Sequence, residues 1–199
     1  MATTYAIDLV PVEAQGRSAA KRDWRTLLAT EPPERFWGFG VPVFPPLAGT
    51  VVHVHDDEPD HHARRSPLSL LPYMLGQAAR LRRGAVGLAR NHVVLELAQG
   101  RGYVALAHLQ CGSICVARGD LVRPGQHLGA CGNSGNSTEP HVHLQVMDGA
   151  NPMTARGVPI ASRDSASITV AQSMWLRPAC QQRAPSSSNR TRACPVDGF

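Results

Sequence analysis

Residues 91–109 read NHVVLELAQGRGYVALAHL, and this stretch decides the fold class. Two runs rich in β-branched and apolar residues, 91–97 and 103–109, flank the turn segment Gln99–Gly102, which carries two glycines. Gly in a short connection between two such runs favours an antiparallel hairpin. We therefore predict a β-hairpin at the centre of the chain.

Three further segments around this hairpin have the same character. Residues 4–10 (TYAIDLV) form an apolar run that ends at Pro11, and residues 141–147 (HVHLQVM) alternate between His or Gln and apolar side chains. Residues 41–54 contain short apolar runs broken by Gly and Pro, which indicates two closely turned strands. The fold class that these segments predict is mainly β, with the antiparallel hairpin at its centre.

Length and composition limit the alternatives. At 199 residues the chain corresponds to about 1.3 typical domains, and 43% hydrophobic against 18% charged residues allow a buried core. No apolar run is long enough to span a membrane, and residues 1–8 lack the basic and apolar regions of a signal peptide. The net charge is +5, and all but one of the basic residues are Arg. Tyr73 is the single aromatic residue within the Arg cluster at 64–90, too few for base stacking along it, so we expect no nucleic-acid partner.

Two segments outside the strands have helical patterns. Within residues 56–90, apolar side chains recur at three- and four-residue steps from Leu71 to Leu81, with a natural stop at Gly84. Residues 18–29 predict a short helix that ends before Pro32. The expected organisation is an N-terminal strand and helix (1–40), a core with a helical insertion at 56–90 (41–160), and a C-terminal extension (161–199) that is disordered from about 184.

The five cysteines form no CxxC pair, and their odd number argues against a complete disulfide framework. We expect Cys111, Cys115 and Cys131 to be small core or turn residues.

The pair His141 and His143 is the sharpest local sign of chemistry. Alternation along a strand sends both imidazoles to one face, although a polar surface strand would have the same pattern. His108 lies in a second apolar strand and Asp8 in a third, where each alone is compatible with a satisfied buried residue. A catalytic Zn²⁺ site needs three N or O ligands and nearby acid–base groups, and together these residues offer such parts.

The order of motifs also resembles the M23 (lysostaphin-like, LytM-type) zinc metallopeptidases. The segments that carry the resemblance are Gly49–Val52, Asn91–Leu95, Tyr103–Leu109, Val116–Gly129 and Gly132–His143, with Tyr5–Asp8 more loosely. The resemblance implies an antiparallel β core, a Zn²⁺ cofactor, and cleavage of peptides in bacterial cell-wall peptidoglycan. It also implies that Asp8 and His143 ligate the zinc, while His108 and His141 hold the catalytic water and polarise the scissile carbonyl.

One departure from the family pattern is important. The first zinc ligand of the family is a His upstream of the Asp, and here the position four residues before Asp8 is Thr4. Either the chain begins too late, which we favour, or the protein is a degenerate member with two protein ligands. The His-rich stretch around His53, His55, His61 and His62 could supply a substitute ligand, but we expect it to be a solvated loop.

The sequence is compatible with three functions. The first is a zinc endopeptidase of peptidoglycan, and the second is a non-catalytic M23-like module that binds wall peptide or a partner hydrolase. The third is a phosphocarrier related to the glucose-permease IIA domain, which uses two close histidines without zinc. Members of the M23 family usually act outside the cytoplasm, whereas oligomeric state and export route are left undetermined by the sequence.

Overall fold

A computed structural model describes residues 5–19, 26, 29–64, 66, 91–100, 102–152 and 154–159. The helix predicted from the pattern at 71–84 lies outside the described residues, and so do most of the helix predicted at 18–29 and the extension from 161 onward. Among the described residues, no helix is long and apolar enough to cross a membrane.

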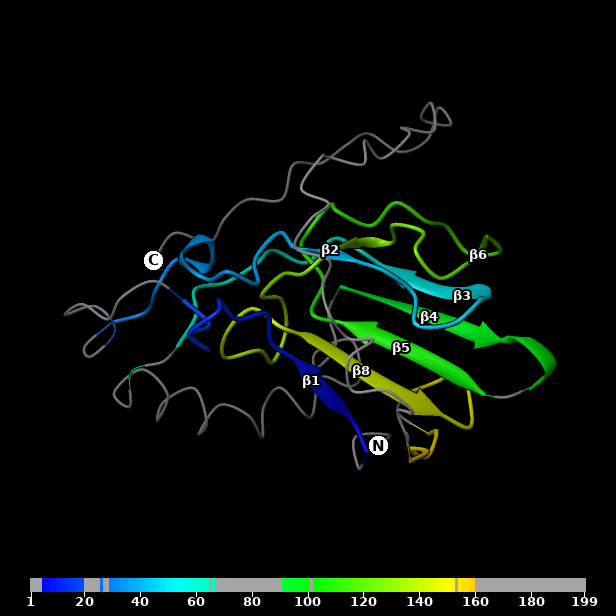
Figure 1. Cartoon of the computed structure of the whole chain (residues 1–199). Helices are drawn as coiled ribbons and strands as arrows, with labels where there is room; N and C mark the ends of the chain where they lie inside the picture. Colours follow the sequence, from blue (N-terminus) through cyan, green and yellow to red (C-terminus); the bar gives the residue numbers. More distant parts are fainter. Residues whose placement is uncertain are drawn as a thin grey trace, which may run out of the picture.

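A six-stranded sheet forms the centre of the molecule, with the strand order β1-β8-β5-β4-β3-β6 and antiparallel pairing throughout. Figure 1 shows these strands side by side, from β6 at the top to β1 at the bottom. The strands are β1 (Ile7–Leu9), β3 (Gly49–His55), β4 (His92–Leu97), β5 (Tyr103–Ala107), β6 (Leu121–Val122) and β8 (Val142–Met147). A second sheet pairs β2 (Pro42–Val43) with β7 (Gly129–Ala130), and two short 3₁₀ helices, η1 and η2, span Pro33–Arg35 and Ala98–Gly100.

The predicted mainly β, antiparallel fold is therefore confirmed. The central hairpin is β4 and β5, joined through η2 and closed by a hydrogen bond from the Leu97 amide to the Gly102 carbonyl. The two strands expected in residues 41–54 are β2 and β3, and β1 is shorter than the apolar run 4–10.

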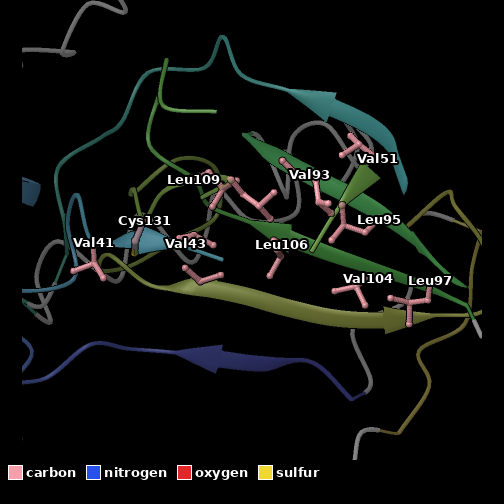
Figure 2. Close-up of a cluster of buried hydrophobic side chains, with 13 residues drawn as sticks. Val41, Val43, Val51, Val93, Leu95, Leu97, Val104, Leu106, Leu109 and Cys131 are labelled. Carbon is pink, nitrogen blue, oxygen red and sulfur yellow. The ribbon is translucent and has the colours of Figure 1, made fainter. Parts of the chain in front are cut away.

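One face of the large sheet carries the main hydrophobic core. Alternate residues of β4 and β5, such as Val93, Leu95, Val104 and Leu106, are fully buried there. Figure 2 shows these side chains gathered in one cluster with others from the segments around β2 and β7. Because side chains alternate along a strand, the residues between them face the opposite side of the sheet.

The cysteine expectation is wrong for two positions. Cys111 and Cys115 are both disulfide-bonded. Cys131 is a buried free thiol in the main core, as expected, and burial raises its pKa to about 12. Spacing alone could not reveal these bonds, since disulfide partners are matched by distance in the folded chain rather than along the sequence.

Candidate metal centre

A row of cross-strand partners runs across the sheet face opposite the main core. In register, Asp8 lies opposite His143, His143 opposite Ala107, and Ala107 opposite His92. Directly opposed residues share one face, and their Cβ atoms lie about 4.5–5.5 Å apart. Strand pairing therefore brings Asp8 and His143 together, although 135 positions separate them in the chain.

The carboxylate of Asp8 in this row contacts two histidines. The Nδ1 atom of His143 lies 2.8 Å from Oδ1 of Asp8, and Nε2 of His141 lies 3.6 Å from the same oxygen. A single ion with bonds of about 2.0–2.2 Å to O and N requires ligand atoms this close together. Asp8 and His143 are thus near enough to share one metal.

His108 joins this group because of an irregularity after β5. In a regular strand, residue 108 would face the same side as Leu106, toward the main core. Its φ of 63° is left-handed and interrupts this alternation, and its ring lies 4.8 Å from that of His141 and 5.8 Å from that of His143. Such a conformation is uncommon for a residue other than glycine and costs about 1–3 kcal/mol, so the surrounding loop has to enforce it.

Backbone carbonyls orient two of the rings. Nδ1 of His108 donates to the Ser134 carbonyl at 2.7 Å, and Nδ1 of His141 donates to the Glu139 carbonyl at 2.7 Å. In a neutral ring, a proton on Nδ1 leaves the lone pair on Nε2. Each ring is therefore fixed in the tautomer whose Nε2 can accept a proton or bind a metal.

Burial keeps His108 uncharged. Desolvation, followed by the neighbouring His141 and His143, lowers its pKa to about 3. A neutral imidazole at physiological pH can serve as a base, whereas a protonated one cannot.

The loop behind these rings is held by a carboxylate that the sequence analysis did not single out. Asp60 is buried and accepts hydrogen bonds from the amides of Asn133, at 2.6 Å, and Cys111, at 2.9 Å. Gly132 lies directly against it, and its amide donates to the His108 carbonyl. Asp60 therefore fixes the start of the loop whose Ser134 carbonyl orients His108.

Asn91 was also missed as a supporting residue. Its fully buried side chain donates to the carbonyl of Leu109, next to His108, at 3.1 Å and to that of Glu58 at 2.7 Å. The signal in the sequence was a polar amide side chain directly before an apolar strand. A buried amide of this kind needs several hydrogen-bond partners, so it holds neighbouring segments in place.

The His-rich stretch is not simply a solvated loop. His61 has its ring nitrogens against the carbonyls of Gly135 and His62, and burial lowers its pKa. Its ring is therefore engaged in supporting the loop that follows β7. Thr4, at the position of the first family ligand, lies outside the described residues.

The donor set fits a divalent transition metal. Among the described residues, His108, His141 and His143 each offer a ligand atom, and these atoms lie within 4.8 Å of one another. In the neutral tautomer, the Nε2 lone pair of His141 faces the Asp8 carboxylate, and a proton or a cation between these acceptors would relieve their repulsion. Imidazole nitrogen together with one carboxylate oxygen is a typical set for Zn²⁺.

Fold and site together define an antiparallel β protein with a candidate His and Asp metal-binding group at the end of three neighbouring strands. Residues 76–155 match the model of peptidase family M23, so this part of the chain is similar to that family.

One curated protein is similar to part of the chain. The peptidoglycan DD-endopeptidase ShyA of Vibrio cholerae is 33% identical over 87 residues, which are 40% of this chain and 20% of ShyA. The chain therefore spans about a fifth of that relative's length.

Two solved structures are also similar. The catalytic domain of lysostaphin from Staphylococcus simulans is 23% identical, covers 61% of this chain and 70% of its own, and has a TM-score of 0.40. A zinc-containing peptidase from Vibrio cholerae is 22% identical, with 62% and 28% covered and a TM-score of 0.39.

Proposed function

We propose that this protein is a zinc metalloendopeptidase that hydrolyses peptide bonds of bacterial cell-wall peptidoglycan. The observation that carries the proposal is the convergence of Asp8, His143, His141 and His108, within an M23 sequence match, on one end of the sheet. ShyA, a relative over 87 residues, is a peptidoglycan DD-endopeptidase, which favours wall peptides as the substrate class.

In this proposal Asp8 and His143 would hold the zinc, since Oδ1 of Asp8 and Nδ1 of His143 already lie side by side. When bound, the ion supplies a Lewis acid that polarises a carbonyl and makes water a better nucleophile. A further protein ligand upstream of Asp8 would complete the three that catalytic zinc sites commonly use.

His108 and His141 carry the acid–base chemistry of the proposal. The neutral His108 ring donates its Nδ1 proton to Ser134, so Nε2 can accept a proton from the attacking water. His141, held in the same tautomer by Glu139, lies beside it and can orient the scissile carbonyl. Both rings are buried and pre-oriented, so little reorganisation accompanies proton transfer.

Activity outside the cytoplasm fits this role, since peptidoglycan lies there. The disulfide-bonded Cys111 and Cys115 support the same location, because disulfides persist mainly in oxidising compartments.

The second candidate function is a catalytically degenerate M23-like module that binds wall peptide or a partner hydrolase. The observation that favours it is Thr4 at the position of the first family ligand. A chain with only two protein ligands would hold zinc weakly and cleave poorly.

Zinc content and hydrolysis of purified peptidoglycan test the two functions together. The enzyme proposal expects zinc in the Asp8 and His143 site and release of new amino termini from the wall peptides. The same assay on a chain extended by the residues encoded upstream of Met1 tests whether a His ahead of Asp8 is the further zinc ligand. Inactivity of an extended form that contains a His ahead of Asp8 would reject the enzyme and favour the binding module.

A further inference from the structure

A second group of metal-ligating side chains lies on the same sheet face as the first. It consists of His55, the last residue of β3, and Asp57 and Glu58 in the segment that follows. One ligand atom from each residue lies within 4.8 Å of the other two. His55 is the register partner of His92, which extends the row of Asp8 and His143 to a further strand.

The ring nitrogen at the centre of this group lacks a hydrogen bond. Nε2 of His55 is buried from solvent and lies 2.8 Å from Oδ1 of Asp57 and 4.0 Å from Oε1 of Glu58. The contact with Asp57 is close but not aligned as a hydrogen bond, so the ring nitrogen stays unsatisfied. Buried polar atoms normally have a partner, and two carboxylates beside an imidazole nitrogen are suited to share a cation with it.

Buried neighbours hold the side chain of His55 and the backbone of Glu58 in place. The His55 ring stacks on His92, with centroids 5.9 Å apart, and His92 itself contacts His53 through ring nitrogens 3.1 Å apart. The backbone of Glu58 is clamped on both sides by Asn91, which accepts from its amide at 3.0 Å and donates to its carbonyl at 2.7 Å. Such preorganisation lowers the cost of binding.

We propose that His55, Asp57 and Glu58 form a second divalent-cation site that prefers Zn²⁺. Two ligand atoms bound tetrahedrally at about 2.0–2.2 Å lie about 3.3–3.6 Å apart. The distance from Nε2 of His55 to the Asp57 carboxylate, 2.8 Å, is shorter than this value, and the distance to the Glu58 carboxylate, 4.0 Å, is longer. The side chain of Asp57 is 79% exposed, so it can move to the required distance. An imidazole ligand favours zinc over Mg²⁺ or Ca²⁺, which prefer oxygen ligands alone.

The second site is structural rather than part of a two-metal centre. His55 lies three strands from His143, which at about 4.8 Å per strand is about 14 Å, whereas paired catalytic metals lie about 3.5–4 Å apart. An ion here would fix the segment between β3 and Asp60, the carboxylate that supports the His108 loop. The inference does not depend on whether the first site is catalytic.

Zinc stoichiometry and affinity of the full chain test this inference. The double variant Asp57→Asn and Glu58→Gln preserves side-chain shape but removes both carboxylates. We expect it to bind one zinc ion fewer per chain than the wild type, by elemental analysis after equilibration with zinc and gel filtration. The matched control is Glu96→Gln, which removes an exposed carboxylate of β4 and should leave the zinc count unchanged.

A second background separates the two sites. In a His143→Ala chain, whose first site is disabled, titration calorimetry with ZnCl₂ should still detect one ion. Adding Asp57→Asn and Glu58→Gln to that chain should weaken binding at least 100-fold, with circular dichroism unchanged. Equal zinc counts for the wild type and the carboxylate variant, or no zinc bound by the His143→Ala chain, would overturn the inference.

Discussion

Gly132→Ala tests whether the loop behind His108 is packed as tightly as the structure shows. A Cβ at this position would stand 2.5 Å from Oδ1 of Asp60 and even closer to the backbone N and Cα of Gln110. Ordinary contacts of Cβ atoms begin at 3.4 Å, so the carboxylate alone would have to retreat by about 0.9 Å. Since Asp60 also holds the Asn133 amide, the loop cannot yield without loosening that hydrogen bond.

The expected loss of stability is about 3 kcal/mol, at the upper end for overpacking. For a chain of this size it corresponds to a fall in Tm of about 6–12 °C. Because the Ser134 carbonyl that orients His108 belongs to the same loop, a shift of about 1 Å would also lower any cleavage rate by about 10²-fold. Differential scanning calorimetry and the peptidoglycan assay measure the two effects separately.

Gly149→Ala is the matched control. Its added Cβ would meet only the Cβ of Ala155, at an ordinary 3.5 Å, so its stability should stay within about 1 kcal/mol of the wild type. A Gly132→Ala protein that melts within 2–3 °C of this control, a difference of about 1 kcal/mol, would refute the packing argument.

The remaining predictions concern the histidines of the first site. His143→Ala should lower the zinc content by one ion per chain and abolish hydrolysis, because of the two proposed zinc ligands only Asp8 would remain. Unchanged zinc content would show that His143 is not a ligand. His108→Ala should keep that zinc and lower the cleavage rate by about 10²–10⁴, the usual contribution of a positioned acid–base group; a rate within threefold of the wild type would exclude that role. A third prediction concerns the metal-free protein in the presence of a chelator. The pKa of His108 is about 3 in the folded chain and about 6.5 in the unfolded chain, so the unfolded chain binds more protons. The stability of the wild type therefore decreases as the pH falls through 6.5. Between pH 7.5 and 5 the free energy of unfolding should fall by about 2 kcal/mol. Thermal melts should show a smaller decrease for His108→Ala. Equal pH dependence of stability in both proteins would contradict the conclusion that the His108 ring is buried and neutral.

Local pattern was enough to predict the central strands and the pair His141 and His143. The hairpin at 91–109 and the strand at 141–147 were predictable because alternation and a glycine-bearing turn are properties of neighbouring residues. The pair His141 and His143 was recognisable for the same reason, since residues two apart in a strand share a face.

Only the tertiary structure decided which residues meet. The pairing of β1 with β8 brings Asp8 to His143, and the left-handed backbone at His108 turns its ring away from the core and toward both other histidines. Neither follows from local pattern, because register and an isolated positive φ are set by contacts between distant segments.

The supporting residues and the disulfide-bonded cysteines depended on the fold for the same reason. Asp60 and His61 looked like part of a solvated acidic and His-rich loop, but they are held against the Asn133 loop. Cys111 and Cys115 gave no sign of their bonds in their spacing. A sequence by itself determines which side chains could bind a metal or carry a proton. The distances, burial and hydrogen bonds that decide whether they can act together arise only when segments far apart in the chain are packed side by side.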